Sequence, residues 1–270
     1  MPILSRGRAS LNMLRRVTGA AAVAVGTLMV AASAEETGST PAPAHPTAEF
    51  SFVRLVYTDA AGGFGFGRGF RDGHWWVDYP NSEIHFRRGI RRLTRVQVAE
   101  NDVMLPVTDD RIFDYPWLYA VEVGHWYLND EEAARLREYL LRGGFLIVDD
   151  FHGTREWSVF LESIKRVFPH RPIIDIADED EVLHDVYDLN ERIQIPGIRA
   201  LMMGQTYEYD GYKPEWKGIY DDDGRLMVAI NHNMDMGDAW ELADDPRYPE
   251  PMTALAYRFA VNYVVYAMTH

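Results

Sequence analysis

The stretch from Asn129 to Gly153 constrains the fold more than any other part of the chain. Its residue pattern is that of a helix, a two-glycine turn, a strand and a sharp acidic turn. Asn129 is suited to cap the helix, and Glu132 stands where its carboxylate can reach back to the cap. The run at 145–148 is continuously apolar, as in strands that are covered on both faces of a parallel sheet. This unit predicts an α/β protein in which the 145–148 strand is central.

The predicted helix before that strand has one apolar face and one charged face. Ala133, Leu136 and Leu140 recur at helical spacing, so we expect them to be buried. Two pairs of opposite charge are spaced four residues apart on the other face: Glu131 with Arg135, and Glu138 with Arg142.

Further strands and helices alternate along the chain. Apolar runs predict strands at 50–57, 103–105, 117–123, 173–176 and 226–230. Helical periods predict helices at 82–96, 154–167 and 252–268, with a partly helical segment at 179–189. In the first of these helices, Phe86, Ile90 and Leu93 are expected to face inward. The alternation predicts a three-layer, doubly wound, mainly parallel sheet.

Two segments carry weaker signals. Asp223-Gly224 predicts a hairpin turn between 219 and 226. Residues 190–217 show no sustained period, which is typical of a lid, of a binding loop, or of elements that the pattern does not reveal.

Residues 1–34 have the features of an export signal. Four arginines precede an uncharged run at 17–30, and Ala32-Ser33-Ala34 follows the small-x-small pattern of a cleavage site. The run is short and rich in Ala and Gly, so a cleaved signal is favoured over a retained anchor. Both the general and the twin-arginine export routes stay open. We expect a periplasmic or exported chain cleaved near Ala34, a flexible linker at 35–49, and one domain at 50–270.

The charge balance limits the partners. The chain has 27 basic and 41 acidic residues, and removal of four arginines with residues 1–34 leaves 23 basic residues and a net charge of −18. Such a surface disfavours nucleic acid and anionic membranes. We expect no nucleic-acid partner and no stable membrane span in the mature form. Because cysteine is absent, disulfides and thiol nucleophiles are excluded.

Glycines alternate along residues 62–69, after the first predicted strand. A dinucleotide-binding loop needs G-x-G-x-x-G that opens directly into a helix, and this spacing is missing. We therefore expect no nucleotide cofactor. The aromatic residues that follow, Trp75, Trp76 and Tyr79, are more typical of core anchors than of a sugar-stacking platform.

Acidic and histidine side chains follow several predicted strands. In doubly wound sheets, ligands bind outside the carboxyl ends of the strands, so these residues are the candidates for a site. The candidates for ligand binding are Tyr57, Asp59, Glu122, His125, Asp238 and Trp240. The candidates for catalysis are Asp149, Asp150 and His152, and those for a divalent metal are His232 and Asp235. Asp150, His152, His232 and Asp235 are expected to converge near Glu122.

Each candidate also has a structural explanation. Asp150 or Thr154 is suited to cap a helix, and Asp235 to stabilise a turn. Adjacent strand residues point to opposite faces, so Asp149 and Asp150 share a pocket only if the strand has already ended. We expect one of these two carboxylates to be a supporting residue.

Ten motifs spread over nearly the whole mature chain resemble those of one bacterial family. They are Phe52–Tyr57, Asp78–Pro80, Arg92–Thr94, Phe113–Pro116, Arg142–Phe151, Val167–Pro169, Ile219–Arg225, Asn231–Asn233, Gly237–Glu241 and Asn262–His270. The family is domain of unknown function 4159. The resemblance implies a flavodoxin-like sheet similar to that of class I glutamine amidotransferases. It implies no assigned reaction and no catalytic residues.

The chain departs from the amidotransferase pattern at the central turn. That superfamily has a cysteine after a central strand, whereas this chain has Asp149 and Asp150, contains no cysteine, and has no G-x-S-x-G motif in its place. Hydrolysis of glutamine by a thiol is therefore excluded.

Two functional hypotheses remain. The first is a non-catalytic domain that binds an unknown small molecule or assembles with an envelope protein. The second is a hydrolase, with or without a divalent metal, that uses Asp149 or Asp150 together with His152 or His232. We favour the first, because no known catalytic motif is complete.

Overall fold

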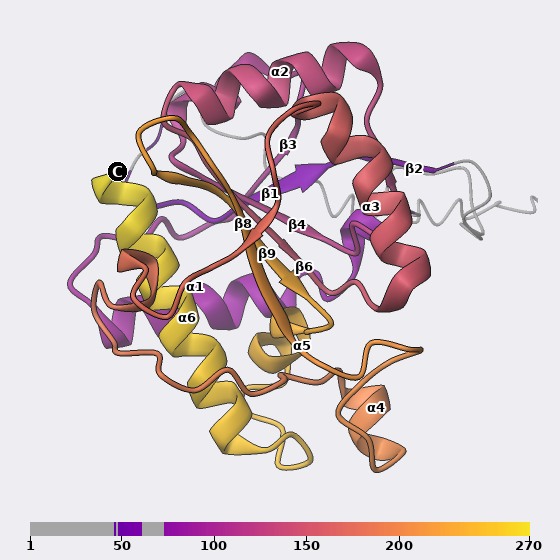
Figure 1. Cartoon of the computed structure of the whole chain (residues 1–270). Helices are drawn as coiled ribbons and strands as arrows, with labels where there is room; N and C mark the ends of the chain where they lie inside the picture. Colours follow the sequence, from indigo (N-terminus) through magenta and orange to yellow (C-terminus); the bar gives the residue numbers. More distant parts are fainter. Residues whose placement is uncertain (1–45, 47, 61–72) are drawn as a thin grey trace, which may run out of the picture. The chain divides into compact units, whose positions relative to one another are not determined.

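The computed structural model describes residues 46, 48–60 and 73–270 (Figure 1). The export signal, most of the linker and the glycine-rich loop lie outside the described residues, so the interpretations of those segments stay predictions. Within the described part, no helix combines the length and the apolar character needed to cross a membrane.

A seven-stranded sheet forms the centre of the fold, in the order β3-β1-β4-β6-β9-β8-β7. The strands are β1 (Val53–Val56), β3 (Val103–Pro106), β4 (Trp117–Val121), β6 (Phe145–Asp149), β7 (Ile174–Asp175), β8 (Glu215–Tyr220) and β9 (Leu226–His232). The first five in the spatial order are parallel, whereas β8 and β7 are antiparallel to their neighbours. A small second sheet pairs β2 (Thr58–Asp59) with β5 (Trp126–Tyr127). The α/β class and the mainly parallel sheet are confirmed, with β6 in the middle.

Helices cover both faces of the sheet (Figure 1). One face is covered by α2 (Asp130–Leu141) and α3 (Gly153–Val167), and the other by α1 (Asn81–Leu93), α5 (Met236–Glu241) and α6 (Glu250–Thr269). The remaining helical elements are short: α4 (Ile198–Met202) and the 3-10 turns η1 (His74–Trp76), η2 (Asp110–Asp114) and η3 (Glu181–Leu183).

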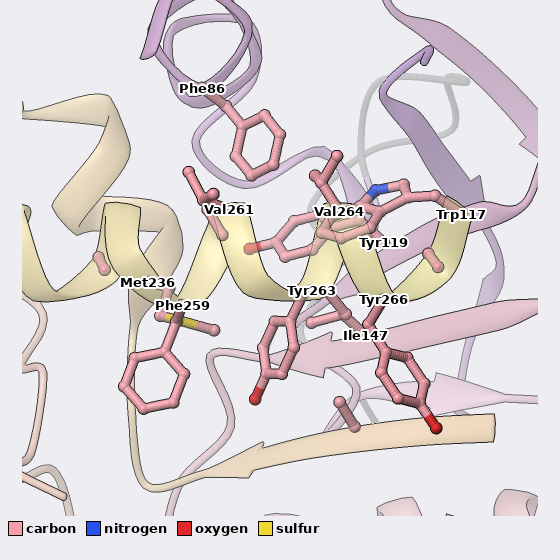
Figure 2. Close-up of a cluster of buried hydrophobic side chains, with 14 of the residues drawn as sticks. Phe86, Trp117, Tyr119, Ile147, Met236, Phe259, Val261, Tyr263, Val264 and Tyr266 are labelled. Atoms are coloured by element: carbon pink, nitrogen blue, oxygen red, sulfur yellow. The ribbon is translucent and has the colours of Figure 1, made fainter. Parts of the chain in front are cut away.

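Alternate residues of the central strand enter different cores. Phe145 and Ile147 join the core beneath α1, α5 and α6, and Leu146 and Val148 join the core beneath α2 and α3. Figure 2 shows the first of these cores, with Tyr263 of α6 packed over the sheet. Because both faces of β6 are covered, the continuous apolar run of its sequence is explained.

Helix α2 begins as its sequence predicts. The Asn129 side chain accepts a hydrogen bond from the Glu132 amide at 3.0 Å, and the Glu132 carboxylate accepts one from the Asn129 amide at 2.8 Å. Ala133, Leu136 and Leu140 are buried against α3 and the sheet. The capping box and the inward face are confirmed.

Only one of the two ion pairs expected on α2 forms. Arg142 lies 3.1 Å from Glu138, as predicted. Arg135 pairs with Asp110 and lies 3.4 Å from Glu138, so it is not paired with Glu131. The predicted Glu131–Arg135 pair is therefore wrong, because tertiary contact with η2 offers Arg135 a different carboxylate.

The prediction that Leu93 faces inward is also wrong. Phe86 and Ile90 are buried, whereas Leu93 is 48% exposed. Helix α1 ends at Leu93, and the chain leaves in extended conformation at Thr94. The last turn of the helix therefore lies beyond the core that the rest of α1 covers.

The segment without a sustained period contains elements that the sequence pattern did not reveal. It includes α4 and the start of β8, and β8 forms the predicted hairpin with β9 through Gly224 at φ 87°. In β8, Trp216 and Ile219 are buried, but Gly218 stands between them. A glycine in so short a strand leaves no apolar period to detect.

The two leucines at the end of α2 test the buried face of this helix. Leu140 is fully buried, whereas the adjacent Leu141 is 50% exposed. We expect Leu140→Ala to lower the free energy of unfolding by about 2–5 kcal/mol, because the truncation leaves a cavity in the core. The matched variant Leu141→Ala is expected to cost less than about 0.5 kcal/mol. Urea denaturation measures both, and equal losses would contradict the packing described.

Candidate functional site

Left-handed backbone is concentrated at the carboxyl edge of the sheet. Among the described residues, five that are not glycine have positive φ: Asp78 (63°), Glu122 (53°), Asp150 (54°), Tyr209 (48°) and Asn233 (64°). Glu122, Asp150 and Asn233 directly follow β4, β6 and β9. Such conformations cost on the order of 1–3 kcal/mol each and cluster at binding and active sites. The backbone therefore marks this edge as the candidate site.

Asp149 ends β6 and is fully buried. Its Oδ2 accepts hydrogen bonds from the amides of Met236 (2.9 Å) and Gly237 (3.1 Å) and from the Tyr119 hydroxyl (3.1 Å). Burial raises the pKa of Asp149 to about 7, and these hydrogen bonds oppose that rise. With no exposed surface, Asp149 has no route to a substrate. Its geometry is that of the supporting member of the Asp149–Asp150 pair.

Asp150 turns away from the strand and pairs with His152. Its Oδ1 lies 3.1 Å from His152 Nε2, and both side chains are at least nine-tenths buried. Burial and the nearby carboxylate of Asp78 raise the pKa of Asp150 well above its usual range. Burial lowers the pKa of His152, so its imidazole is neutral at pH 7. The pair is a buried carboxyl group beside a neutral imidazole.

Asp78, Asp235 and Asp238 form a compact group of carboxylates. One oxygen of each lies within 4.8 Å of the others. Asp235 Oδ1 caps α5 by accepting from the Asp238 amide at 2.7 Å, and Asp238 Oδ2 accepts from the Ile198 amide at 2.7 Å. Asp78 Oδ2 is buried and has no hydrogen-bond partner. We call these three residues the aspartate group.

Glu208 extends this group from the segment between α4 and β8. A Cβ built on Gly197 would lie 2.8 Å from Asp235 Oδ2, 2.9 Å from Glu208 Oε1 and 3.4 Å from Asp238 Oδ2. Any side chain at position 197 would therefore enter the space toward which three carboxylates converge. Glycine at this position keeps that space open.

The electrostatics of the aspartate group are unfavourable without a counter-charge. Burial, and then the carboxylate of Asp238, raises the pKa of Asp78 well above its usual range. Burial, and then Asp150, does the same to the pKa of Asp235. Desolvation and like charge both disfavour the ionised form. The group thus favours either bound protons or a bound cation.

Glu122, His125 and Glu156 form a second group on the α3 side of the edge. His125 Nε2 lies 3.6 Å from Glu122 Oε2 and 3.6 Å from Glu156 Oε1. This is longer than a hydrogen bond. It matches the spacing of two ligand atoms that lie about 2.2 Å from a shared tetrahedral metal. A Cβ on Gly124 would lie 2.4 Å from the Glu156 Cβ, so glycine there permits the approach of the two segments.

Tyr57 and Asp59 support this second group. The Tyr57 hydroxyl donates to the carbonyls of Val121 (2.7 Å) and Glu122 (2.9 Å) and so holds the turn after β4. Asp59 Oδ2 lies 3.0 Å from Nδ1 of His74, whose ring stacks on His125 at 3.8 Å.

Trp240 lies in the core and not at the site. Its side chain is fully buried and packs edge-on against Phe86, with the ring centroids 4.8 Å apart. Trp240 therefore has no surface with which to touch a ligand, and its place among the ligand-binding candidates is corrected. Trp75, 4% exposed, is likewise a core anchor.

His232 does not join the aspartate group. Its Nδ1 lies 2.8 Å from Glu215 Oε2, and its Nε2 lies 3.2 Å from the Gly153 carbonyl oxygen. Its ring packs on Trp157 of α3, at 4.7 Å between centroids. His232 is the last residue of β9 and packs on the α3 side, whereas Asp235 caps α5, which covers the opposite face of the sheet. The expected convergence of His232 with Asp235 is therefore not found, although Asp150 interacts electrostatically with both Glu122 and Asp235.

Three members of the site were not candidates from the sequence. Asp78 precedes a helix and follows no strand, Glu156 lies in the first turn of α3, and Glu208 lies in the segment without a clear period. Acids in a first helical turn are common. Only the Asp-Tyr-Pro motif at Asp78 offered a signal.

The comparisons agree with the family resemblance. A family model described as Domain of unknown function (DUF4159) matches residues 51–268. No curated protein matches the chain. Because the match covers most of the sequence, this chain belongs to the DUF4159 family of domains of unknown function.

Proposed function

We propose that this domain binds a divalent cation through Asp78, Asp235 and Asp238, as a binding domain without catalysis of its own. The observation that carries the proposal is made at Asp78. Its Oδ2 atom is buried and has no hydrogen-bond partner. One oxygen of the Asp78 carboxylate also lies within 4.8 Å of an oxygen of Asp235 and of Asp238. A donor set made only of oxygen suits Ca²⁺, Mg²⁺ or Mn²⁺.

A bound cation would offset the unfavourable free energy of burying these carboxylates together. Burying several carboxylates together is unfavourable unless they are neutralised. Burial and the Asp238 carboxylate raise the pKa of Asp78 in spite of the opposing charge of Arg54. Among the described residues, the ion pairs of Arg54 and Arg87 are with Glu83 and Asp102 and not with this group. Glu208 Oε1 and Asp235 Oδ2 border the same open position at Gly197, so a further carboxylate oxygen stands beside the group. The cation would retain open coordination positions for a ligand.

The proposed setting follows the sequence. We infer an exported, periplasmic chain in which this domain serves ligand binding or assembly in the cell envelope. We also propose that the scaffold is related to the flavodoxin-like sheet of the class I glutamine amidotransferases. Asp150 supports that relation, because it occupies a left-handed turn directly after the central strand. The partner is then a small molecule or an envelope protein.

One observation favours a second function, that of a hydrolase. Asp150 stands in a left-handed conformation, and His152 Nε2 lies within 3.1 Å of its carboxylate. A carboxyl group beside a neutral imidazole that can accept its proton is suited to nucleophilic or general-base chemistry. His232 is less suited, because Glu215 and Gly153 engage both of its ring nitrogens.

Cation binding is tested by calorimetric titration of the mature chain with Ca²⁺, Mg²⁺ and Mn²⁺. We expect Asp78→Asn and Asp238→Asn each to lower the affinity for the preferred ion by at least about tenfold, because each removes a charged ligand. Asp222→Asn makes the same change in charge at a side chain that is 90% exposed, and should leave the affinity unchanged. Absence of binding by all three ions would refute the proposal.

The stability of the metal-free protein is expected to fall as the pH rises. The pKa of Asp149 is raised to about 7 in the folded state, and those of Asp78, Asp150 and Asp235 are raised as well. Between the ordinary carboxyl pKa near 4 and about 7, the folded state therefore binds more protons than the unfolded state. The contribution of these carboxyl groups to the unfolding free energy is fully present below the ordinary carboxyl pKa. It is lost as the pH rises through their folded-state pKa values.

Asp149→Asn isolates one contribution to that loss. The amide oxygen can still accept hydrogen bonds, but it carries no charge at any pH. The fall in unfolding free energy from pH 5 to pH 8 should shrink by an amount on the order of a few kcal/mol. Urea denaturation in a chelating buffer at the two pH values measures it. An identical fall in the wild type and in the variant would contradict the role assigned to Asp149.

An assay of hydrolysis distinguishes the proposed binding domain from the alternative hydrolase. We expect the cation-loaded protein to hydrolyse neither p-nitrophenyl acetate nor p-nitrophenyl phosphate, because it is proposed to bind without catalysis. Hydrolysis that is lost in Asp150→Asn and kept in Asp222→Asn would establish the hydrolase in its place.

A further inference from the structure

A separate hollow of about 530 Å³ lies on the α3 side of the same edge. It is bounded by the start of α3, by residues 210–213 and by the ends of β8 and β9. Pockets of this size accommodate one or two rings of a small molecule. Its ten lining residues include no aliphatic side chain. Aromatic rings and the carbon stems of charged side chains supply its apolar surface, so the hollow suits a ligand that has both an apolar face and polar groups.

Two aromatic side chains form part of its wall. Trp157 comes from α3, and Tyr212 comes from the segment before β8. Tyr212 is 65% exposed, although it also packs against Tyr207. Exposed aromatic rings offer flat, amphipathic surfaces at low entropic cost. Such a wall fits a ring that has a C–H face and a polar rim, as a sugar has.

Two charged side chains of the hollow, Glu215 and Lys217, already have partners. Glu215 Oε2 is bound to His232 Nδ1 at 2.8 Å, and Lys217 Nζ lies 2.7 Å from Asp175. Lys213, in contrast, has no carboxylate within 4.0 Å among the described residues. The lining therefore offers one cationic group that is not neutralised.

The hollow suits a carboxylate better than a phosphate group. The N-terminus of α3 is a natural anion site, but Asp210 already occupies it. Asp210 Oδ1 accepts from the Thr154 amide at 2.9 Å, and Oδ2 accepts from the Thr154 hydroxyl at 2.7 Å. A single lysine matches one negative charge and not two. The anion that fits is a carboxylate.

We propose that this hollow binds a sugar ring that carries one carboxylate, as in a uronic acid unit of a glycan. The C–H face of the ring lies on Trp157 and Tyr212, and the carboxylate pairs with Lys213. The ring hydroxyls bond to the polar atoms of the lining, such as those of Asn233. The proposal does not depend on the cation at the aspartate group.

The test uses two probes that differ only in the carboxylate, methyl β-D-glucuronide and methyl β-D-glucoside. Both are titrated into the mature chain in buffer with EDTA, so that the result is independent of the cation proposal. We expect the glucuronide to bind about fivefold tighter or more, because a charge-assisted hydrogen bond is gained. Tyr212→Ala should weaken both probes, and its exposed position leaves the fold intact.

Two lysine variants test whether Lys213 binds the carboxylate. Lys213→Gln should abolish the preference for the glucuronide while the glucoside still binds. Lys165→Gln removes the same charge from α3 outside the hollow, and should keep the preference. Equal affinity for the two probes in the wild type would overturn the assignment of a carboxylate. Absence of binding by both probes, or tighter binding of adenosine monophosphate, would overturn the sugar site itself.

Discussion

The buried carboxylate of Asp149 connects the central sheet to the start of α5. It stands at the end of the central strand, and its Oδ2 gathers the Tyr119 hydroxyl from β4 and the amides of Met236 and Gly237 from the start of α5. These bonds fix α5 against the sheet, and Asp235 caps α5 while Asp238 lies in its first turn. Favourable contact between a carboxylate and a helix start adds to the bonds themselves. The aspartate group is thus rigid on the α5 side.

Asp78 is positioned by a second buried charge, that of Arg54. Arg54 lies in β1, is fully buried, and forms an ion pair with Glu83 of α1. Its Nη1 donates to the carbonyls of Trp75 (2.8 Å) and Val77 (2.9 Å), immediately before Asp78. A buried charge is tolerated only when paired and fully hydrogen-bonded. The same bonds that satisfy the guanidinium therefore hold the turn that presents Asp78.

The predictions from sequence held where the determinants were local, and failed where tertiary contacts decided. The capping box at Asn129 and the apolar run of β6 are local, and both formed as expected. The first part of β8 was not predicted, because Gly218 interrupts the alternation of apolar and polar residues by which a strand is detected. His232 was misassigned for a geometric reason, since the residues between it and Asp235 carry the chain across the edge of the sheet. The position of a residue directly after a strand predicted that it lies at the carboxyl edge of the sheet. It did not predict on which face of the sheet the side chain lies.

The site combines a rigid platform with groups that repel one another. Asp78, Asp150 and Asp235 come from three separate segments, and each has a pKa raised by burial and by its neighbours. No folding advantage follows from bringing such groups together, because desolvation and like charge both oppose it. Proteins retain such costs at functional sites and offset them elsewhere. In this fold, the hydrogen-bond networks of Asp149 and Arg54 offset that cost. The carboxylates themselves add nothing to stability, so the proposed binding of a cation is the better explanation for their presence.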